Sequence, residues 1–382
     1  MDIMRHCAGA VFKKYHDLIY AVFVYSNCKP SANKKVDNYA LHRVKDNGPI
    51  ARLQRRAAMI SKILNAMESA LSGRGIDRET AARLAGLDGG ELPFLFAAGR
   101  KVSQRFRGDS VDICSIVNAK SGACSEDCVF CAQSSHHKTG VRVYPLIDVD
   151  EMARAAEAAK KNRAKRFCIV TSGRGIDSDK DIEKIAEGIS RVRGMGLLPC
   201  ATLGTLSREQ LSYLRDAGLD RYHHNIETSR EFFPRICTTH TFDERLEVLG
   251  YARSIGLSTC SGGILGMGES MKDRISMAFS LRDAGVDSVP INFLMPVMGT
   301  PLENISAVTP MEALQSIALF RLILPDKEIR VCAGRWTALR QLHPMIFIAG
   351  ADGFMIGNYL TQTGLDPRDD LEMIQDMGLY IG

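Results

Sequence analysis

The chain has 382 residues, of which 45% are apolar and 24% charged, a composition typical of a soluble globular protein with one large domain or two ordinary ones. Its net charge is +5, but residues 1–60 alone contribute +7, so the rest of the chain is slightly acidic. A nucleic-acid partner needs basic residues on a folded surface, so no nucleic-acid partner is expected. The apolar run Leu18–Tyr25 is much shorter than the about 20 residues that cross a bilayer, so no membrane partner is expected either.

Residues 1–58 differ from the rest of the chain. They are basic and polar over much of their length and lack a sustained hydrophobic period, whereas an amphipathic helical pattern runs over Ile60–Leu71. We therefore expect a poorly ordered basic leader over 1–58, with Met59 or a nearby residue as the true start. A genuine extension, for example for targeting, is the alternative. Residues 59–108 are expected to form an N-terminal helical segment.

Residues 109–382 show a regular alternation of strands and helices. Short β-rich runs and amphipathic helical patterns recur at roughly 30-residue intervals, the rhythm of parallel βα units. This pattern favours an α/β fold, a TIM-type (β/α)8 barrel with its chemistry at the carboxyl ends of the strands. A doubly wound open sheet is the alternative, but no glycine-rich nucleotide fingerprint follows the first strand. The expected strands are Val111–Val117, Arg166–Thr171, Leu198–Leu203, Arg221–Glu227, Ser258–Leu265, Ser288–Leu294, Glu328–Cys332 and Gly353–Ile356. The expected helices between them include Asp150–Lys161, Asp179–Met195, Ser207–Ala217, Thr241–Ser254, Met271–Ala284 and Pro310–Leu322.

Three cysteines follow the first expected strand in a C-x3-C-x2-C spacing: Cys124, Cys128 and Cys131. A structural zinc site is the alternative, but such sites usually combine two C-x-x-C pairs and no second pair is present. Three thiolates on a 4Fe-4S cluster leave one iron open, and that iron can chelate the amino and carboxylate groups of a methionine. The loop, with Phe130 before its last cysteine, resembles the signature of the radical S-adenosylmethionine superfamily.

Four more cysteines lie within the expected strands that follow the three-cysteine loop. A single buried cysteine is ordinarily a small apolar residue, but four on separate strands that share the inward face can converge on a second cluster. Arg330 and Cys332 are two positions apart, so a regular strand points both to the same side. The odd total of eleven cysteines and the lack of a signal peptide indicate reduced thiols in the cytoplasm. The strand cysteines are Cys168, Cys200, Cys260 and Cys332, whereas Cys7, Cys28, Cys114 and Cys237 are expected to be buried or incidental thiols.

From about residue 109 to the C-terminus the sequence resembles the biotin synthase family. The resemblance implies insertion of one sulfur atom between two saturated carbons of dethiobiotin, with one S-adenosyl-L-methionine consumed for each C–H bond. It also implies an electron donor such as flavodoxin or ferredoxin, and a homodimer. The matching stretches are 121–135, 201–207, 224–225, 260–269, 289–292 and 299–302.

The resemblance also implies site residues. An auxiliary 2Fe-2S cluster, the source of sulfur in the family, would be held by Cys168, Cys200, Cys260 and Arg330. Cofactor contacts fall on Phe130, Asn225, Glu227, Arg245 and Ile264, and substrate contacts on Asn292 and His223.

Cys332 departs from the family, which usually has Ser at this position. Cys332 is therefore a candidate auxiliary-cluster ligand: a four-thiolate site could hold a larger cluster, such as a 4Fe-4S type, with Arg330 no longer bound to iron. The alternative is a spectator thiol beside a conventional cluster.

Two other functions are weighed against this one. A different radical enzyme of the same barrel class, such as a hydrogenase maturase or an amino-acid mutase, would generally lack the strand cysteines. A non-catalytic iron–sulfur carrier would need an exposed, labile cluster, whereas cysteines within strands are expected to be buried.

Overall fold

The computed structural model describes the backbone of residues 49–382 and the side chains of residues 55–382. The chain divides into two compact units after Lys62. Helix α2 (Pro49–Leu71) begins earlier than the predicted Ile60, so the expected boundary after residue 58 falls inside a helix. Residues 1–48, most of the expected leader, lie outside the described residues, as do Cys7 and Cys28. No helix among the described residues is long and apolar enough to span a membrane.

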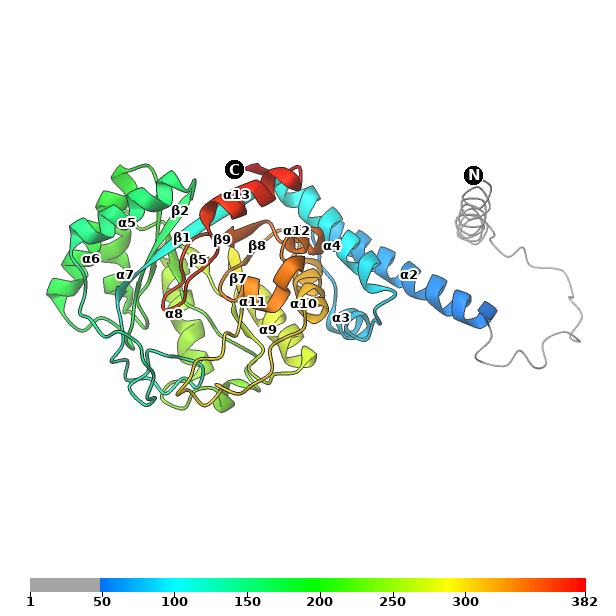
Figure 1. Cartoon of the computed structure of the whole chain (residues 1–382), viewed down its shortest axis with the longest axis horizontal. Helices are drawn as coiled ribbons and strands as arrows, with labels where there is room; N and C mark the ends of the chain where they lie inside the picture. Colours follow the sequence, from blue (N-terminus) through cyan, green and yellow to red (C-terminus); the bar gives the residue numbers. More distant parts are fainter. Residues whose placement is uncertain (1–48) are drawn as a thin grey trace, which may run out of the picture. The chain divides into compact units, whose positions relative to one another are not determined.

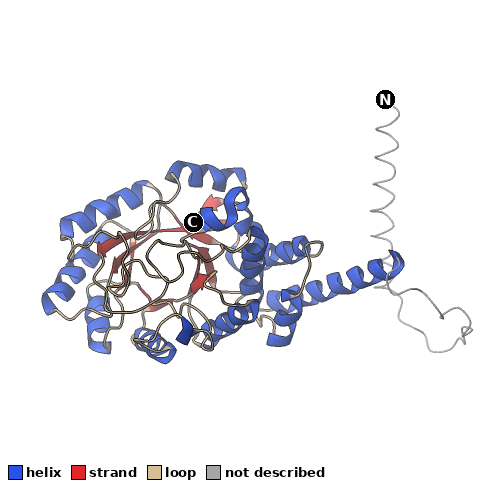
Figure 2. Ribbon diagram, turned by 60° about the horizontal axis from the view of Figure 1, so that its bottom comes forward, coloured by secondary structure: helices blue, strands red, loops and turns tan. Residues whose placement is uncertain are grey.

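The predicted TIM-type barrel is confirmed in the second unit. Its strands pair in parallel in the order β1-β2-β3-β4-β5-β7-β8-β9, and β1 also pairs with β9, which closes the ring. Figure 2 shows this ring of strands surrounded by helices. The strands are β1 (Ser110–Lys120), β2 (Arg166–Thr171), β3 (Leu198–Thr202), β4 (Arg221–His223), β5 (Ser258–Cys260), β6 (Gly263–Leu265), β7 (Ser288–Phe293), β8 (Glu328–Val331), β9 (Gly353–Met355) and β10 (Tyr380–Ile381).

The helices form the outer layer of the barrel (Figure 1). Three of them begin at capping boxes, at Ser207, Thr241 and Ser270; each box satisfies backbone N–H groups of the first turn and fixes where the helix starts. After the N-terminal α3 (Arg78–Ala85) and α4 (Leu92–Arg107), the helices are α5 (Val149–Lys161), α6 (Asp179–Gly194), α7 (Arg208–Asp216), α8 (Phe242–Ser254), α9 (Met271–Asp283), α10 (Pro310–Ile323), α11 (Arg335–Leu339), α12 (Met345–Ala349) and α13 (Pro367–Asp376).

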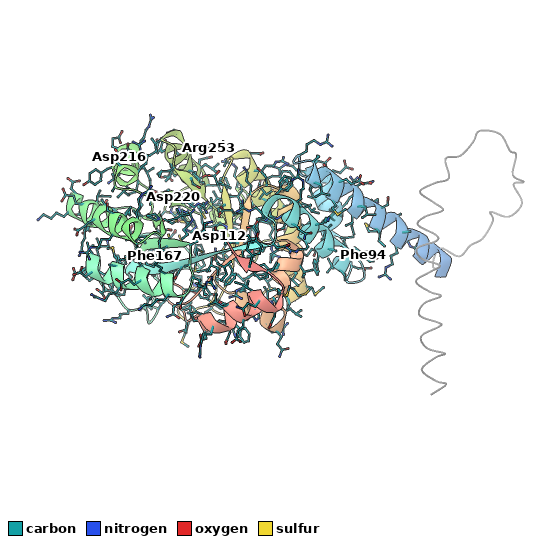
Figure 3. All side chains as sticks on the ribbon, turned by 90° about the horizontal axis from the view of Figure 1, so that it is seen from above. Phe94, Asp112, Phe167, Asp216, Asp220 and Arg253 are labelled. Carbon is teal, nitrogen blue, oxygen red and sulfur yellow. The ribbon has the colours of Figure 1, made fainter. Side chains whose placement is uncertain are left out.

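Strand β2 illustrates why these segments become barrel strands. Every residue of β2 is buried, as expected for a parallel strand that is covered by helices on one side and by the barrel interior on the other. Phe167, labelled in Figure 3, is fully buried, whereas its neighbour Cys168 belongs to the opposite face of the strand.

Two predicted strands end more than one residue early or are interrupted in the structure. The strand expected over Arg221–Glu227 ends at His223, and Glu227 adopts a left-handed φ of 66° that no regular strand contains. The strand expected over Ser258–Leu265 is divided into β5 and β6 at Gly262, where a Cβ atom would lie 1.9 Å from the carbonyl oxygen of Pro290. Both breaks lie at the carboxyl ends of strands, where the backbone turns to form the site.

Candidate active site

The three-cysteine loop follows β1 and is held by its own backbone. The amide of Cys124 donates to the carbonyl of Gln133 (3.0 Å), and the amide of Cys131 donates to the carbonyl of Cys128 (3.0 Å). Ala123 takes a left-handed φ of 50°. Cys124 and Cys128 are buried, Cys131 is partly buried, and all three thiols are free. The loop therefore presents three sulfur atoms that are in no disulfide, from one short segment with a fixed backbone.

These thiols line a cavity of about 210 Å³ at the carboxyl ends of the strands. The structure brings most of the predicted cofactor residues to the same cavity. Ile264 and Asn292 do not line it: they lie on the adjoining β6 and β7, where Asn292 donates to the carbonyl of Gly263 (3.2 Å) and accepts from the amide of Ala333 (3.0 Å). The predicted residues that line the cavity are Cys124, Cys128, Phe130, Cys131, His223, Asn225, Glu227 and Arg245.

His223 and Asn225 form an ordered polar chain in this cavity. The side-chain oxygen Oδ1 of Asn225 accepts from the amide of Gly262 (3.0 Å), which fixes the orientation of the Asn225 amide. The same oxygen lies 2.7 Å from Nε2 of His223. Nε2 must then carry the proton, which leaves Nδ1 to accept from the hydroxyl of Thr202 (2.8 Å). This arrangement holds a neutral imidazole, and desolvation lowers the pKa of His223 to about 4.

The depressed pKa of His223 predicts a pH dependence of stability. Below about pH 6.5, the ordinary pKa of histidine, His223 is protonated in the unfolded chain but stays neutral in the folded protein. The free energy of unfolding therefore falls as the pH drops toward 4. The slope is expected to be shallower for His223→Gln. Urea unfolding of the cluster-free protein at several pH values measures both slopes, and an unchanged slope in the variant would contradict the assignment.

Arg245 places a guanidinium at the wall of the cavity. Its Nη1 donates to the carbonyl of Asn225 (2.7 Å), its Nε donates to Nε2 of His240 (2.9 Å), and Glu227 lies at 3.7 Å. Burial raises the pKa of Glu227, although the cation opposes this effect. The left-handed backbone of Glu227 is fixed by hydrogen bonds with Gly262 and Ile264. The cavity thus contains a fixed cation suited to a carboxylate ligand.

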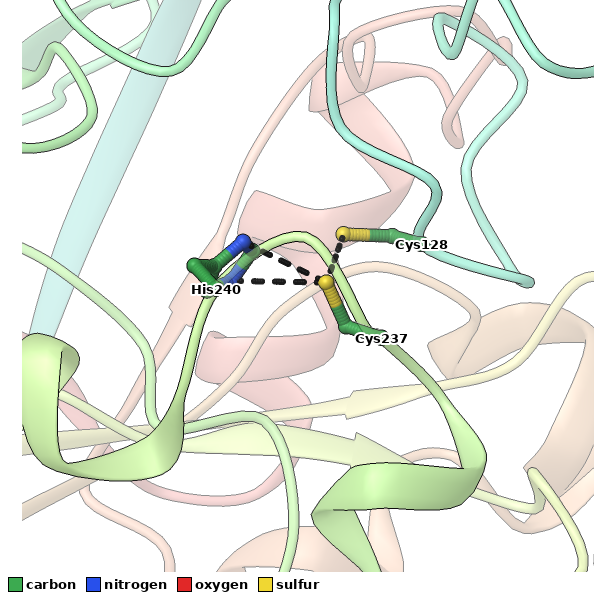
Figure 4. A group of neighbouring side chains, drawn as sticks. All are labelled: Cys128, Cys237 and His240. Atoms are coloured by element: carbon green, nitrogen blue, oxygen red, sulfur yellow. Dashed lines mark hydrogen bonds between the residues drawn. The ribbon is translucent and has the colours of Figure 1, made fainter.

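Cys237 joins this site although the sequence indicated only a buried or incidental thiol. Its burial is confirmed, but its Sγ lies 3.7 Å from Sγ of Cys128 and 3.2 Å from Nδ1 of His240 (Figure 4). The hydrogen bond from Cys128 is the main cause that lowers the pKa of Cys237 to about 4. Cys128, Cys237 and His240 together have the donor atoms of a metal site. The C-x2-H spacing of Cys237 and His240 was the sequence signal that could have indicated it.

A second group of thiols lies within the barrel. Cys168 and Cys200 are register partners on β2 and β3, and burial raises the pKa of Cys260 on β5 to about 12. Cys332 follows β8, and the neighbouring thiol of Cys114 on β1 is the main cause that raises its pKa. All five thiols are buried and free. Soft sulfur donors gathered in a dry chamber fit an iron–sulfur cluster, and Cys114, expected to be incidental, belongs to the group.

Arg330 lies among these thiols with its donor groups engaged. Nε donates to the hydroxyl of Ser288 (3.0 Å), Nη1 to Asp112 (2.9 Å) and Nη2 to Glu328 (2.6 Å); Asp112 is labelled in Figure 3. Two carboxylates stabilise the protonated guanidinium, and the pKa of Arg330 is raised despite desolvation. A protonated guanidinium has no lone pair to give to iron.

Comparison with known proteins agrees with this geometry. Residues 119–292 match the Radical SAM superfamily, and residues 290–380 match the Biotin and Thiamin Synthesis associated domain. Among solved structures, methylornithine synthase has a TM-score of 0.73 at 18% identity, covering 83% of this chain and 97% of that one. HydG, a maturase of the FeFe-hydrogenase, has a TM-score of 0.71 at 16% identity, covering 85% and 76%. These two likenesses show the fold, and together with the cysteine loop and the superfamily match they define a radical S-adenosylmethionine enzyme.

Sequence relatives narrow the class. The chain is 49% identical over 315 residues to the biotin synthase of Geotalea daltonii, covering 82% of this chain and 96% of that protein. It is 48% identical over 324 residues to the biotin synthase of Heliobacterium modesticaldum, covering 84% and 99%. The chain therefore belongs to the biotin synthase family.

Proposed function

We propose that this enzyme forms biotin from dethiobiotin, the last step of biotin biosynthesis. The reaction breaks two C–H bonds and forms two C–S bonds, so it needs both a hydrogen-abstracting agent and a sulfur donor. One observation carries the proposal: a three-cysteine loop at the mouth of the barrel lies above a second group of buried thiols within it. A radical enzyme without sulfur insertion has no evident use for the second group.

Cys124, Cys128 and Cys131 would hold a 4Fe-4S cluster, and S-adenosylmethionine would bind its open iron. When bound, this pair supplies a 5′-deoxyadenosyl radical that removes hydrogen from dethiobiotin. The residues of the chain bind and shield it: Arg245 offers a cation to the methionine carboxylate, and Asn225, backed by Gly262, offers an amide N–H group. The buried residues at the strand ends would limit the access of water, which would protect a reactive intermediate from side reactions.

Replacing Arg245 with Lys tests this contact. A lysine cannot reproduce the planar fork that bonds both Asn225 and His240. The KM for S-adenosylmethionine is expected to rise roughly tenfold, the loss of about one charge-assisted hydrogen bond, with a smaller change in kcat. Arg253→Lys, at the exposed end of the same helix α8, is the matched control and should leave both constants unchanged. An unaltered KM in the Arg245 variant would exclude the cofactor contact.

The auxiliary cluster would be the sulfur donor. We assign Cys168, Cys200 and Cys260 as ligands, with Cys332 in place of Arg330 as a further one. The ion pairs of Arg330 with Asp112 and Glu328 support this choice, because they hold the guanidinium protonated. The chamber would then suit a cluster larger than 2Fe-2S. A clean 2Fe-2S Mössbauer signal that is unaffected by Cys332→Ala would contradict the assignment.

The remaining features of the proposal follow from the family. We expect an electron donor of the flavodoxin or ferredoxin type, a homodimer and a cytoplasmic location. Asn292 and His223 remain candidates for dethiobiotin contacts; His223 lines the cavity, and Asn292 lies on a neighbouring strand with both amide atoms bonded to the backbone.

Release of 5′-deoxyadenosine distinguishes this function from its rivals. Under anaerobic conditions with a reductant, release is expected to depend on dethiobiotin and to be accompanied by biotin, scored by mass. A maturase-like or mutase-like enzyme would release 5′-deoxyadenosine with another substrate and not with dethiobiotin. A cluster carrier would release none, and either outcome would refute the proposal.

A further inference from the structure

We propose that Cys114 is a further thiolate ligand of the auxiliary cluster, acting with Cys332 from the β1–β8 side of the barrel. This inference rests on the proposed function, because it concerns the same auxiliary site. It departs from the assignment above in adding a ligand on β1, a strand whose only expected role was to lead into the three-cysteine loop.

The first argument is the layering of the barrel interior. A layer in a TIM barrel consists of four side chains contributed by alternate strands. Cys114 on β1, Cys200 on β3, Cys260 on β5 and Arg330 on β8 come from alternate strands of the closed ring. They also interact electrostatically around a closed circuit: Cys114 with Cys200, Cys200 with Cys260, Cys260 with Arg330, and Arg330 with Cys114. Cys114 therefore belongs to the same layer of the barrel interior as Cys200, Cys260 and Arg330.

The second argument is the contact between Cys114 and Cys332. The thiol of each is the main influence on the pKa of the other, and on the other side of the chamber Cys200, the register partner of Cys168, adds to burial in raising the pKa of Cys168. The Sγ of Cys114 is otherwise 3.7 Å from the carbonyl oxygen of Phe354, a weak contact at that distance. Iron that is bound by Cys332 on this side would therefore meet the thiol of Cys114 as the adjacent sulfur donor.

The third argument is the supply of positive charge beneath the thiols. Arg166 is register partner to Cys114, is buried, and is ion-paired with Asp220 through Nη1 (2.5 Å), whereas its Nε has no hydrogen-bond partner within the described residues. Arg221 is held by Glu328 at 2.6 Å and faces Cys200 and Cys260. An additional thiolate makes a cluster more negative, and a buried N–H donor without a partner is costly. A thiolate-rich cluster would benefit from this charge and would give the Nε of Arg166 an acceptor.

The test isolates the auxiliary cluster. In the full-length chain with Cys124, Cys128 and Cys131 all replaced by Ala, the loop can no longer hold a cluster, whereas the barrel thiols still can. This parent is reconstituted anaerobically with iron and sulfide, and its iron, sulfide and Mössbauer spectrum are compared with those of the same protein carrying Cys114→Ser. Serine nearly preserves the volume, and thermal unfolding of the cluster-free proteins checks the fold.

Cys114→Ser is expected to lose about half or more of the auxiliary iron, or to retain iron with a new Mössbauer site typical of an oxygen ligand. Cys237→Ser removes a buried thiol outside the barrel layer whose neighbour Cys128 is already Ala in this parent, so it is the control and should match the parent. Identical iron, sulfide and spectra in parent and Cys114→Ser would overturn this inference alone. A parent that binds no auxiliary iron would instead refute the proposed function.

Discussion

Cys128→Ala is expected to reduce both biotin formation and reductive cleavage of S-adenosylmethionine to background. Cys128 is one of three thiols in the loop after β1, and a 4Fe-4S cluster with an open iron needs all three. The loop has a fixed backbone, so no neighbouring residue within it can take the place of the missing sulfur. Discontinuous assays of 5′-deoxyadenosine and biotin, with iron counted on the same samples, measure the effect.

The spectrum of the auxiliary cluster separates this loss from misfolding. The barrel thiols lie on other strands, so the Cys128 variant should keep the auxiliary Mössbauer signal while it loses the iron of the loop cluster. Cys237→Ala is the nearest control, because its sulfur lies 3.7 Å from that of Cys128 but outside the C-x3-C-x2-C loop; it should retain the loop cluster. Full activity of Cys128→Ala, or equal loss of both clusters, would contradict the assigned role.

Arg321→Met is expected to cost about 3–5 kcal/mol of unfolding free energy, because it leaves the carboxylate of Asp352 buried without its main cation. Arg321 is fully buried on α10, is ion-paired with Asp352, and donates to the carbonyls of Gly350 (2.7 Å) and Lys327 (2.7 Å). The second cation near Asp352, Arg107, lies farther away at 3.5 Å. Urea unfolding of the cluster-free protein measures the loss.

Two further variants make this result specific. Arg83→Ala removes an exposed pair with Glu79 and should change the unfolding free energy by less than about 1 kcal/mol. Adding Asp352→Asn to Arg321→Met removes the stranded charge and should restore part of the stability. A loss below about 1 kcal/mol in Arg321→Met, or no recovery in the double variant, would show that Arg107 and the backbone already satisfy Asp352.

The barrel and its three-cysteine loop could be predicted because their signals are local. The hydrophobic periodicity predicts most ends of the barrel helices to within one or two residues. The predicted strand Arg166–Thr171 has the same bounds as β2 in the structure. The ligand loop is a contiguous motif, and its position after the first strand places it at the mouth of any such barrel. The breaks at Glu227 and Gly262, which depend on contacts between strands, altered two predicted strands, and helix α2 begins well before the predicted Ile60.

The places of Cys114 among the barrel thiols and of Cys237 beside Cys128 could not be predicted, because they depend on tertiary packing. Alternation within β1 shows which residues share a face with Cys114, but only the stagger of the closed barrel puts it in one layer with Cys200 and Cys260. Cys237 meets Cys128 because the segment after β4 packs on the cysteine loop, where the amide of Val129 donates to the carbonyl of Ile236 (2.9 Å). A contact between two segments far apart in the sequence cannot be predicted from the spacing of residues within either segment.

The origin of the sulfur atom provides the most direct test of the proposed function. The enzyme would be reconstituted anaerobically with sulfide enriched in a heavy sulfur isotope, freed of unbound sulfide, and given dethiobiotin, S-adenosylmethionine and reductant for a single turnover. Biotin carrying the heavy isotope is expected, with loss of sulfide from the barrel thiols and not from the cluster of Cys124, Cys128 and Cys131. Biotin with unlabelled sulfur, or no biotin from enzyme with both clusters filled, would contradict a sulfur-donating cluster inside this barrel.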